Sequence, residues 1–368
     1  MKSKLQRDLS RETKKGGRHF YTSFHIADIS LEVKRIRDKT LTYNNVDLEV
    51  AISNLDLFFL INQLNYACNV VNTRRILQAP KYEFPLLEKI VDKLPSTPYF
   101  DLPLIEVYWN SYKMLFTDNK AYYSTLKLLL FNHYHVLIKY HQINLFNHLQ
   151  NYCIQKINSG DSTYYAELWE ISIFRLENGL IKELSPASYK NLITTGVMLA
   201  LQQENTDFAA VLQFIENYTE KLPIEYREEA QTYAQSYIAF YQNHFQVVPQ
   251  KLIVNQEPLT LYKFEDIFYQ IDARRLLVMT YFCLEEEDNF DKLCSNQSVF
   301  LSERRELIPE LELEKNRQFL VIIKRLFWIH GSRMERTEQL QQLKKEIEEA
   351  ENISDRIWLL KQVEAKSK

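Results

Sequence analysis

Apolar side chains recur at every third or fourth residue along most of the chain, which is the spacing that places them on one face of an α-helix. Alternation with a period of two, which is typical of half-buried strands, is almost absent. The sequence therefore predicts an all-α fold. The predicted helices cover residues 19–38, 46–77, 83–94, 101–117, 119–132, 136–158, 162–178, 186–204, 206–222, 224–243, 262–286, 288–304, 310–330, 334–351 and 354–366.

Proline and glycine support this interpretation. Proline ends helices or occupies their first turn, and all ten prolines fall between the predicted helices or at their starts. The chain has only six glycines, whereas α/β nucleotide-binding folds need glycine for phosphate loops and tight turns. Composition therefore argues against a fold of that class.

The short connections between the predicted helices make neighbouring helices antiparallel. Each hairpin must then bury its apolar stripe against the next one, so we expect an α-solenoid, a stack of helical hairpins. We predict a basic flexible tail at residues 1–18 and a single continuous helical-repeat domain at 19–330. The charged helices of 331–368 are predicted to cap the stack, with a narrow apolar stripe made of Leu340, Leu343 and Ile347.

One segment has the layout of a helical repeat. Residues 188–223, SYKNLITTGVMLALQQENTDFAAVLQFIENYTEKLP, place a small Gly196 in the first helix, a polar turn after it, Ala209 early in the second helix, and a closing Pro223. The helices that open near 186, 224 and 262 start about 38 residues apart, close to the period of about 34 in tetratricopeptide arrays.

With these features the chain resembles a degenerate tetratricopeptide-like helical-repeat protein. It is also similar to uncharacterised bacterial proteins of this type, over roughly residues 50–366. The stretches that carry this similarity are LQNYCIQKINSGDSTYYAELWEI (149–171), SYKNLITTGV (188–197), YQIDARRLLVMTYF (269–282) and DRIWLLKQV (355–363). The resemblance implies a helical superhelix, and the family brings no assigned activity.

A line of amides lies in the predicted helix 46–77. Its apolar face consists of Leu57, Leu60, Ile61, Leu64, Cys68 and Val71, and a separate ladder consists of Asn62, Asn65, Asn69 and Asn72, continued by Arg75. Asparagine offers one acceptor and two donors without charge, and arginine offers a planar fork of donors. We predict that this ladder binds an extended peptide or a terminal carboxylate, as in tetratricopeptide clamps. The alternative is a solvent-exposed helix side.

Residues 119–160 contain no Asp or Glu, but they hold four lysines, four histidines and seven aromatic residues. Basic residues interleaved with aromatic ones are typical of single-stranded nucleic-acid binding. Together with the seven basic residues of 1–18, this segment supports an alternative function as a nucleic-acid-associated factor. In a helical repeat the same aromatic residues pack between hairpins, and a net charge of −3 argues against a dedicated nucleic-acid binder.

Motifs for catalysis are lacking in the sequence. It contains no Gly-x-Ser-x-Gly elbow, P-loop or dinucleotide fingerprint. His141 and His148 lie seven residues apart, but the segment has neither a His-x-x-x-His pair nor a carboxylate to support a zinc site. We therefore expect no enzymatic activity, no cofactor and no metal.

The four scattered cysteines favour reduced thiols in a cytoplasmic protein. No apolar run approaches the roughly 18 residues of a membrane span, and no secretory signal follows the charged start. The sequence thus predicts a cytoplasmic, non-enzymatic scaffold or adaptor that binds a protein or peptide partner in the groove of a helical-repeat array. The oligomeric state stays open.

Overall fold

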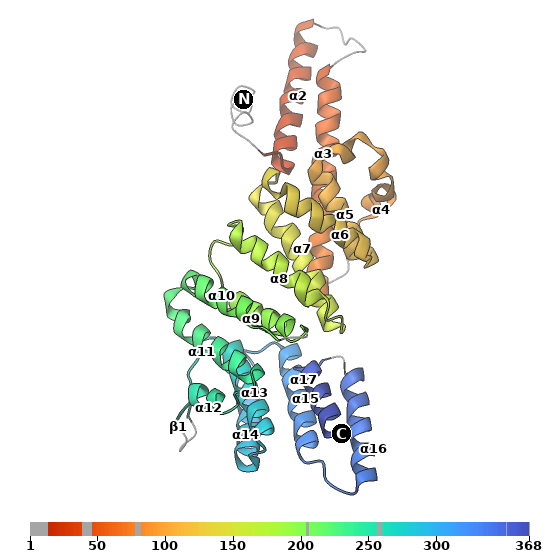
Figure 1. Cartoon of the computed structure of the whole chain (residues 1–368). Coiled ribbons are helices and arrows are strands. Elements are labelled where there is room, and N and C mark those ends of the chain that lie inside the picture. The colour runs from red at the N-terminus through yellow and green to blue at the C-terminus, as the bar shows by residue number, and fades with distance from the viewer. Residues whose placement is uncertain are drawn as a thin grey trace. The chain divides into compact units, whose positions relative to one another are not determined.

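The computed structural model describes residues 14–38, 46–77, 82–203, 206–255, 260–350 and 352–367 (Figure 1). Within these residues it contains sixteen α-helices, so the predicted all-α class is confirmed. The chain divides into two compact units, Met1–Lys182 and Glu183–Lys368. The boundary falls inside the stretch 19–330 that the sequence predicts as one domain, and residues 1–13 of the predicted tail lie outside the described residues.

The described part of unit 1 is helical. Its elements are α2 (Gly17–Asp38), α3 (Val46–Leu77), α4 (Pro85–Ile90), η1 (Val91–Ser96), η2 (Pro98–Asp101), α5 (Pro103–Thr117), α6 (Lys120–His133), η3 (Tyr134–Val136), α7 (Lys139–Asn158) and α8 (Tyr164–Glu177). Proline suits the first turn of a helix because its fixed φ is already helical, and Pro103 begins α5. Asn119 caps α6 by accepting a hydrogen bond of 2.9 Å from the backbone N–H of Ala121.

The core of unit 1 gathers side chains from several of these helices. Leu64 of α3, Tyr108 of α5, Leu126 of α6 and Phe146 of α7 are completely buried. The predicted apolar face of α3 is confirmed, because Leu60, Ile61, Leu64 and Cys68 are buried and Leu57 and Val71 are partly buried. Each such side chain contributes roughly 1.5–3 kcal/mol when it is fully buried, so packing of this face stabilises α3 in its place.

Unit 2 contains the remaining elements. They are α9 (Pro186–Ala200), α10 (Ala209–Tyr218), η4 (Thr219–Lys221), α11 (Ile224–Tyr241), α12 (Val247–Leu252), β1 (Ile253–Asn255), β2 (Thr260–Leu261), α13 (Ile267–Leu284), α14 (Glu287–Glu303), α15 (Glu310–Phe327), α16 (Arg333–Glu349) and α17 (Arg356–Lys366). The stretch 247–261 lies between the predicted helices 224–243 and 262–286. Its described residues form α12 and two short antiparallel strands that pair Ile253 with Leu261.

Local signals explain where the helices of unit 2 begin. The predicted start at Ser185-Pro186 is confirmed, because the Ser185 hydroxyl accepts a hydrogen bond of 3.2 Å from the backbone N–H of Ser188. Ser332 and Glu335 form a capping box at the start of α16. The predicted stripe of Leu340, Leu343 and Ile347 is buried, so α16 turns its narrow apolar face inward.

Within the described residues, no helix combines the length and the apolar character that a membrane span requires.

Candidate functional site

The asparagine ladder of α3 lies against other helices of unit 1. Asn65 is buried, and its Oδ1 accepts hydrogen bonds from the Tyr108 hydroxyl at 2.9 Å and from Asn69 Nδ2 at 3.2 Å. Its Nδ2 donates to the Tyr140 hydroxyl at 3.2 Å. The amide of Asn65 is therefore bonded on both its oxygen and its nitrogen within the unit.

The next two rungs of the ladder contact α7. Asn69 Oδ1 lies 3.1 Å from His148 Nε2, and Asn72 Oδ1 accepts a hydrogen bond of 3.0 Å from Asn151 Nδ2. Asn144 Nδ2 of α7 also lies 3.4 Å from the carbonyl oxygen of the Asn65 side chain. All three pairs are separated by 79 residues in the sequence, which requires α3 and α7 to run in the same direction. The ladder thus forms a polar seam between two helices.

The two ends of the ladder differ from its centre. Asn62 donates a hydrogen bond of 2.7 Å to the Phe58 carbonyl within α3, and it lies beside Gly17, where an added Cβ would be 3.1 Å from Asn62 Nδ2. Arg75 belongs to α3, but its side chain lies outside what the structure describes. Peptide binding by this ladder stays a prediction, and a peptide would have to replace hydrogen bonds that join α3 to α7.

Two buried histidines complete the seam. Tyr108 and the His141 Nδ1 atom are joined by a hydrogen bond of 2.7 Å, and Ser111 Oγ lies 2.9 Å from His148 Nδ1. Burial lowers the pKa of His141 to about 4 and the pKa of His148 to about 3, so both rings are neutral at pH 7. Among the described residues, no group of three His, Cys, Asp or Glu side chains is placed to hold a metal ion.

The acid-free segment 119–160 is paired with acids from elsewhere in unit 1. Lys127 lies 2.6 Å from both Glu167 and Glu170, and Lys156 lies 2.7 Å from Asp118. Several of its aromatic residues belong to the core, namely Tyr123, Phe146 and Tyr152. Part of the positive charge is therefore neutralised within the unit, and these rings are unavailable for stacking on bases.

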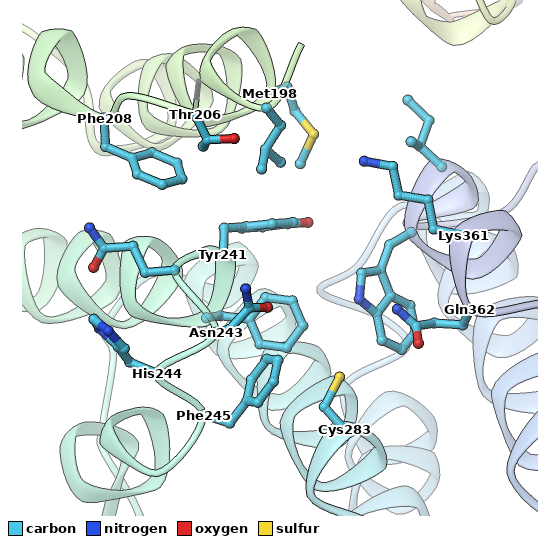
Figure 2. Close-up of a pocket in the computed structure, with 15 residues that line it drawn as sticks. Met198, Thr206, Phe208, Tyr241, Asn243, His244, Phe245, Cys283, Lys361 and Gln362 are labelled. Atoms are coloured by element: carbon cyan, nitrogen blue, oxygen red, sulfur yellow. The ribbon is translucent and has the colours of Figure 1, made fainter. Parts of the chain in front are cut away.

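A cavity with a volume of about 600 Å³ lies in unit 2 (Figure 2). Its walls come from the end of α9, the residues just before α10, the end of α11 with the turn after it, α13 and α17. The lining residues are Met198, Leu201, Thr206, Phe208, Phe240, Tyr241, Gln242, Asn243, His244, Phe245, Cys283, Ile357, Trp358, Lys361 and Gln362. We call this space the aromatic pocket.

The interior and the rim of the aromatic pocket differ in character. Phe240 and Trp358 are buried with ring centroids 6.2 Å apart, and Phe245 lies 5.4 Å from Phe240. Exposed polar side chains, including Asn243 and Lys361, stand around these rings, and Figure 2 shows Lys361 reaching from α17 toward the Tyr241 side. The pocket therefore combines an apolar interior with a polar rim that carries one ammonium group.

The polar groups inside the pocket are neutral at pH 7. Burial raises the pKa of the Cys283 thiol to about 12, so the sulfur stays protonated. Burial also raises the pKa of Tyr241 well above its ordinary value, and the neighbouring Tyr237 and Asp355 add to this effect. The arrangement is suited to enclosing an apolar group and to placing an anionic or hydrogen-bonding group at the rim.

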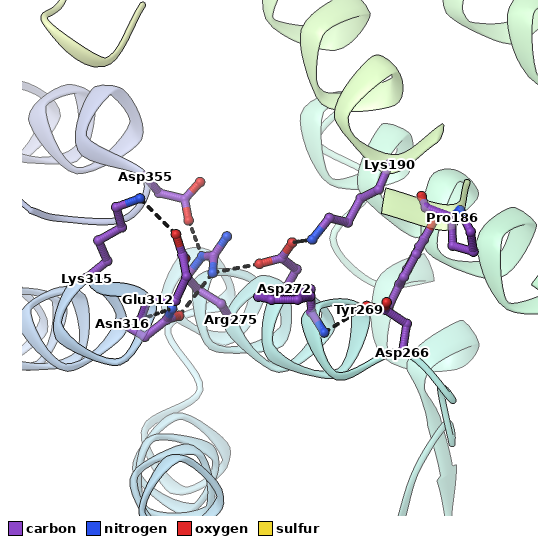
Figure 3. A network of polar contacts seen from close by, with 11 residues as sticks. Pro186, Lys190, Asp266, Tyr269, Asp272, Arg275, Glu312, Lys315, Asn316 and Asp355 are labelled. Atoms are coloured by element: carbon purple, nitrogen blue, oxygen red, sulfur yellow. Dashed lines mark hydrogen bonds and ion pairs between the residues drawn. The ribbon is translucent and has the colours of Figure 1, made fainter. Parts of the chain in front are cut away.

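A buried network of charges holds α17 beside the pocket (Figure 3). Lys190 of α9 lies 2.5 Å from Asp272 of α13, and Asp272 also pairs with Arg275 at 2.8 Å. Arg275 then pairs with Asp355, the residue that precedes α17, and donates a hydrogen bond of 3.0 Å to Asn316 Oδ1. The two cations and two anions balance each other.

The network keeps its charges despite its burial. Burial pushes the pKa of Asp272 upward, but Lys190 and Arg275 together bring it below its ordinary value. Asp355 adopts a left-handed φ of 52° at the start of α17, a conformation that Asp tolerates better than most residues. Because Trp358 and Lys361 follow on α17, the network fixes one wall of the aromatic pocket.

The aromatic pocket has no local signal in the sequence, because its residues come from four separate stretches without a shared motif. The sequence does contain a signal for the polar seam. The spacing of four and then three residues in Asn65, Asn69 and Asn72 recurs in Asn144, His148 and Asn151. Two sets of polar residues with the same spacing indicate two parallel helices whose polar sides face each other.

Comparison with known proteins found no family model, no curated protein and no solved structure that matches this chain. The resemblance to tetratricopeptide-like repeats therefore stays a prediction.

Proposed function

We propose that this protein is a non-enzymatic scaffold or adaptor that binds a protein or peptide partner. The observation that carries the proposal is the aromatic pocket of unit 2, with its apolar interior and its polar rim. One apolar side chain of a partner would enter the pocket and pack against Phe240 and Trp358. Lys361 at the rim would pair with a carboxylate that neighbours this side chain in the partner.

We also propose that the helices within the units stack as an α-solenoid of antiparallel hairpins. In unit 1, α3 and α7 run in the same direction with partners 79 residues apart. In unit 2, the Tyr269 hydroxyl donates to the Pro186 carbonyl and Lys190 pairs with Asp272, at separations of 83 and 82 residues, so α9 and α13 also share a direction. In a stack of antiparallel hairpins, corresponding helices of successive hairpins run in the same direction and are separated along the chain by the helices between them.

The experiment selects peptides on the full-length protein and measures their affinity by fluorescence anisotropy. Peptides from a random library should be enriched in a large apolar residue that is followed or preceded by an acidic group. Thr206→Trp fills the exposed wall of the pocket, and we expect it to weaken binding about tenfold or more because one apolar anchor commonly supplies 2 kcal/mol or more. Lys361→Glu should weaken the same peptides by reversing the rim charge.

Lys292→Glu is the matched control, because Lys292 is an exposed lysine of unit 2 that does not line the pocket. It should leave the affinity unchanged. Equal affinity of the wild type and Thr206→Trp would contradict the proposal. Binding of single-stranded RNA or DNA that weakens steeply between low and physiological salt would instead favour the alternative nucleic-acid function.

A further inference from the structure

Arg274 of α13 is a partly buried arginine, and among the described residues no carboxylate forms a salt bridge with it. Its neighbours Asp272 and Arg275 belong to the balanced network with Lys190 and Asp355. The contact recorded for the Arg274 guanidinium among the described residues is with the Phe300 ring, whose centroid lies 4.2 Å from Cζ. Of the described carboxylates, Glu303 acts on Arg274 electrostatically but forms no salt bridge with it. The partly desolvated guanidinium would therefore be stabilised by an anion that contacts its N–H groups directly.

The electrostatic surroundings of Arg274 are positive. Burial lowers the pKa of Arg274 to about 10, and the nearby Arg304 acts in the same direction, while Glu303 opposes them. Even at this value the guanidinium stays protonated at pH 7. The stacking on Phe300 stabilises the flat face of the group, and it leaves the in-plane N–H donors of the fork free of this contact, so that they can bind an anion.

A cavity of about 300 Å³ lies at this arginine. It is bounded by the segment after β2 and by α13, and its apolar walls include Leu252, Phe264 and Leu277. Lys263 supplies a second cation, and its side chain is 87% exposed and only loosely paired with Glu265 at 3.7 Å. None of the residues that line this cavity lines the aromatic pocket.

We propose that this cavity binds a phosphate group carried on a small organic body. The guanidinium fork of Arg274 would hold two phosphate oxygens, and the Lys263 ammonium would neutralise the second negative charge. Two cations around one small space match a doubly charged phosphate monoester better than a singly charged carboxylate. The apolar walls would enclose the organic part of the ligand.

The test uses the full-length protein and isothermal titration calorimetry with phenyl phosphate, inorganic phosphate and benzoate, all at one ionic strength set with sodium chloride. We expect phenyl phosphate to bind most tightly, inorganic phosphate to bind more weakly because it lacks the apolar part, and benzoate to bind least. Arg274→Lys keeps the charge but removes the fork, and it should weaken phenyl phosphate about tenfold or more. Lys263→Met should also weaken it.

Arg333→Lys is the control, because Arg333 is exposed and lies outside the cavity. It should leave the affinity unchanged, and circular dichroism verifies that each variant is folded. Failure of the wild type to bind phenyl phosphate, equal affinity of Arg274→Lys and the wild type, or a preference for benzoate would each overturn the proposal. Since the aromatic pocket is lined by other residues, peptide binding should be unaffected by these variants.

Discussion

The buried histidines of the polar seam give unit 1 a dependence on pH. The unfolded chain binds a proton on each histidine below a pKa of about 6.5, whereas in the folded unit the pKa values are about 4 for His141 and about 3 for His148. Between these limits the unfolded state binds more protons, so stability falls as pH falls from about 6.5 toward 4. The contribution of each histidine is largely intact above pH 7.

We expect His148→Gln to reduce this dependence. At pH 5, protonation of the unfolded chain should cost the wild type about 2 kcal/mol for each buried histidine relative to pH 8. Urea unfolding at both pH values measures the decrease in the free energy of unfolding from pH 8 to pH 5. This decrease should be about 2 kcal/mol smaller in the variant than in the wild type. His135→Gln, at an exposed position, is the control. An unchanged difference between the two pH values would show that His148 is not buried in its neutral form.

At the scale of residues, the sequence predicted which asparagines share a line but not what they face. The spacing of Asn65, Asn69 and Asn72 follows from helix geometry alone. Their partners on α7 depend on which helices lie side by side, and this is decided by the packing of the whole core. The matched spacing of Asn144, His148 and Asn151 is recognisable only when two distant segments are compared directly.

At the scale of elements, the charged network should hold α17 more firmly than surface ion pairs would. Arg275→Met leaves Asp355 without its cation in a buried setting, and we expect it to lower the free energy of unfolding by about 3–5 kcal/mol. Arg275→Met combined with Asp355→Asn removes the unpaired charge and should recover part of this loss. Urea unfolding measures both effects.

The matched comparison is Lys315→Met, which breaks the more exposed pair with Glu312 at 2.8 Å on α15. That change should cost no more than about 1 kcal/mol. Similar losses for Arg275→Met and Lys315→Met would contradict a special role of the network. The same variants test the pocket, because a loosened α17 displaces Trp358 and Lys361 and should weaken peptide binding.

Element boundaries were predictable wherever a local signal was strong. Residues 46–77 were predicted as one helix, and α3 has these bounds, because its apolar stripe is long and unbroken. The stretch 247–261 was not assigned an element, because α12 contains Pro249 and the strands that follow have two or three residues each. Elements this short carry too little periodicity to be recognised.

At the scale of the whole molecule, the single continuous helical-repeat domain at 19–330 stays a prediction. The contacts divide the chain into two compact units, with the boundary between Lys182 and Glu183. Composition does not mark this boundary. The linker around it, NGLIKELSP, is no longer and no richer in glycine than other turns of the chain. The boundary between such units depends on which helices bury each other's faces, and that information is spread over the full chain.

Two compact units should respond separately to changes that act on one of them. The buried histidines belong to unit 1, and the charged network belongs to unit 2. If each unit unfolds cooperatively by itself, calorimetry should resolve two transitions. Lowering the pH from 8 to 5 should move chiefly the transition of unit 1, and Arg275→Met should move only the transition of unit 2.

An insertion experiment assigns the transitions. Six Gly-Ser residues placed between Lys182 and Glu183 should leave both transitions in place, since both residues are exposed and they belong to different units. The same insertion after Gly160 lies inside unit 1, between α7 and α8. It should lower the midpoint temperature of the transition that responds to acid, because a longer loop increases the entropy lost when α8 packs against the rest of the unit. A single transition that shifts equally in all these variants would show that the two units unfold as one cooperative body, and the boundary at Lys182 would then have no thermodynamic meaning.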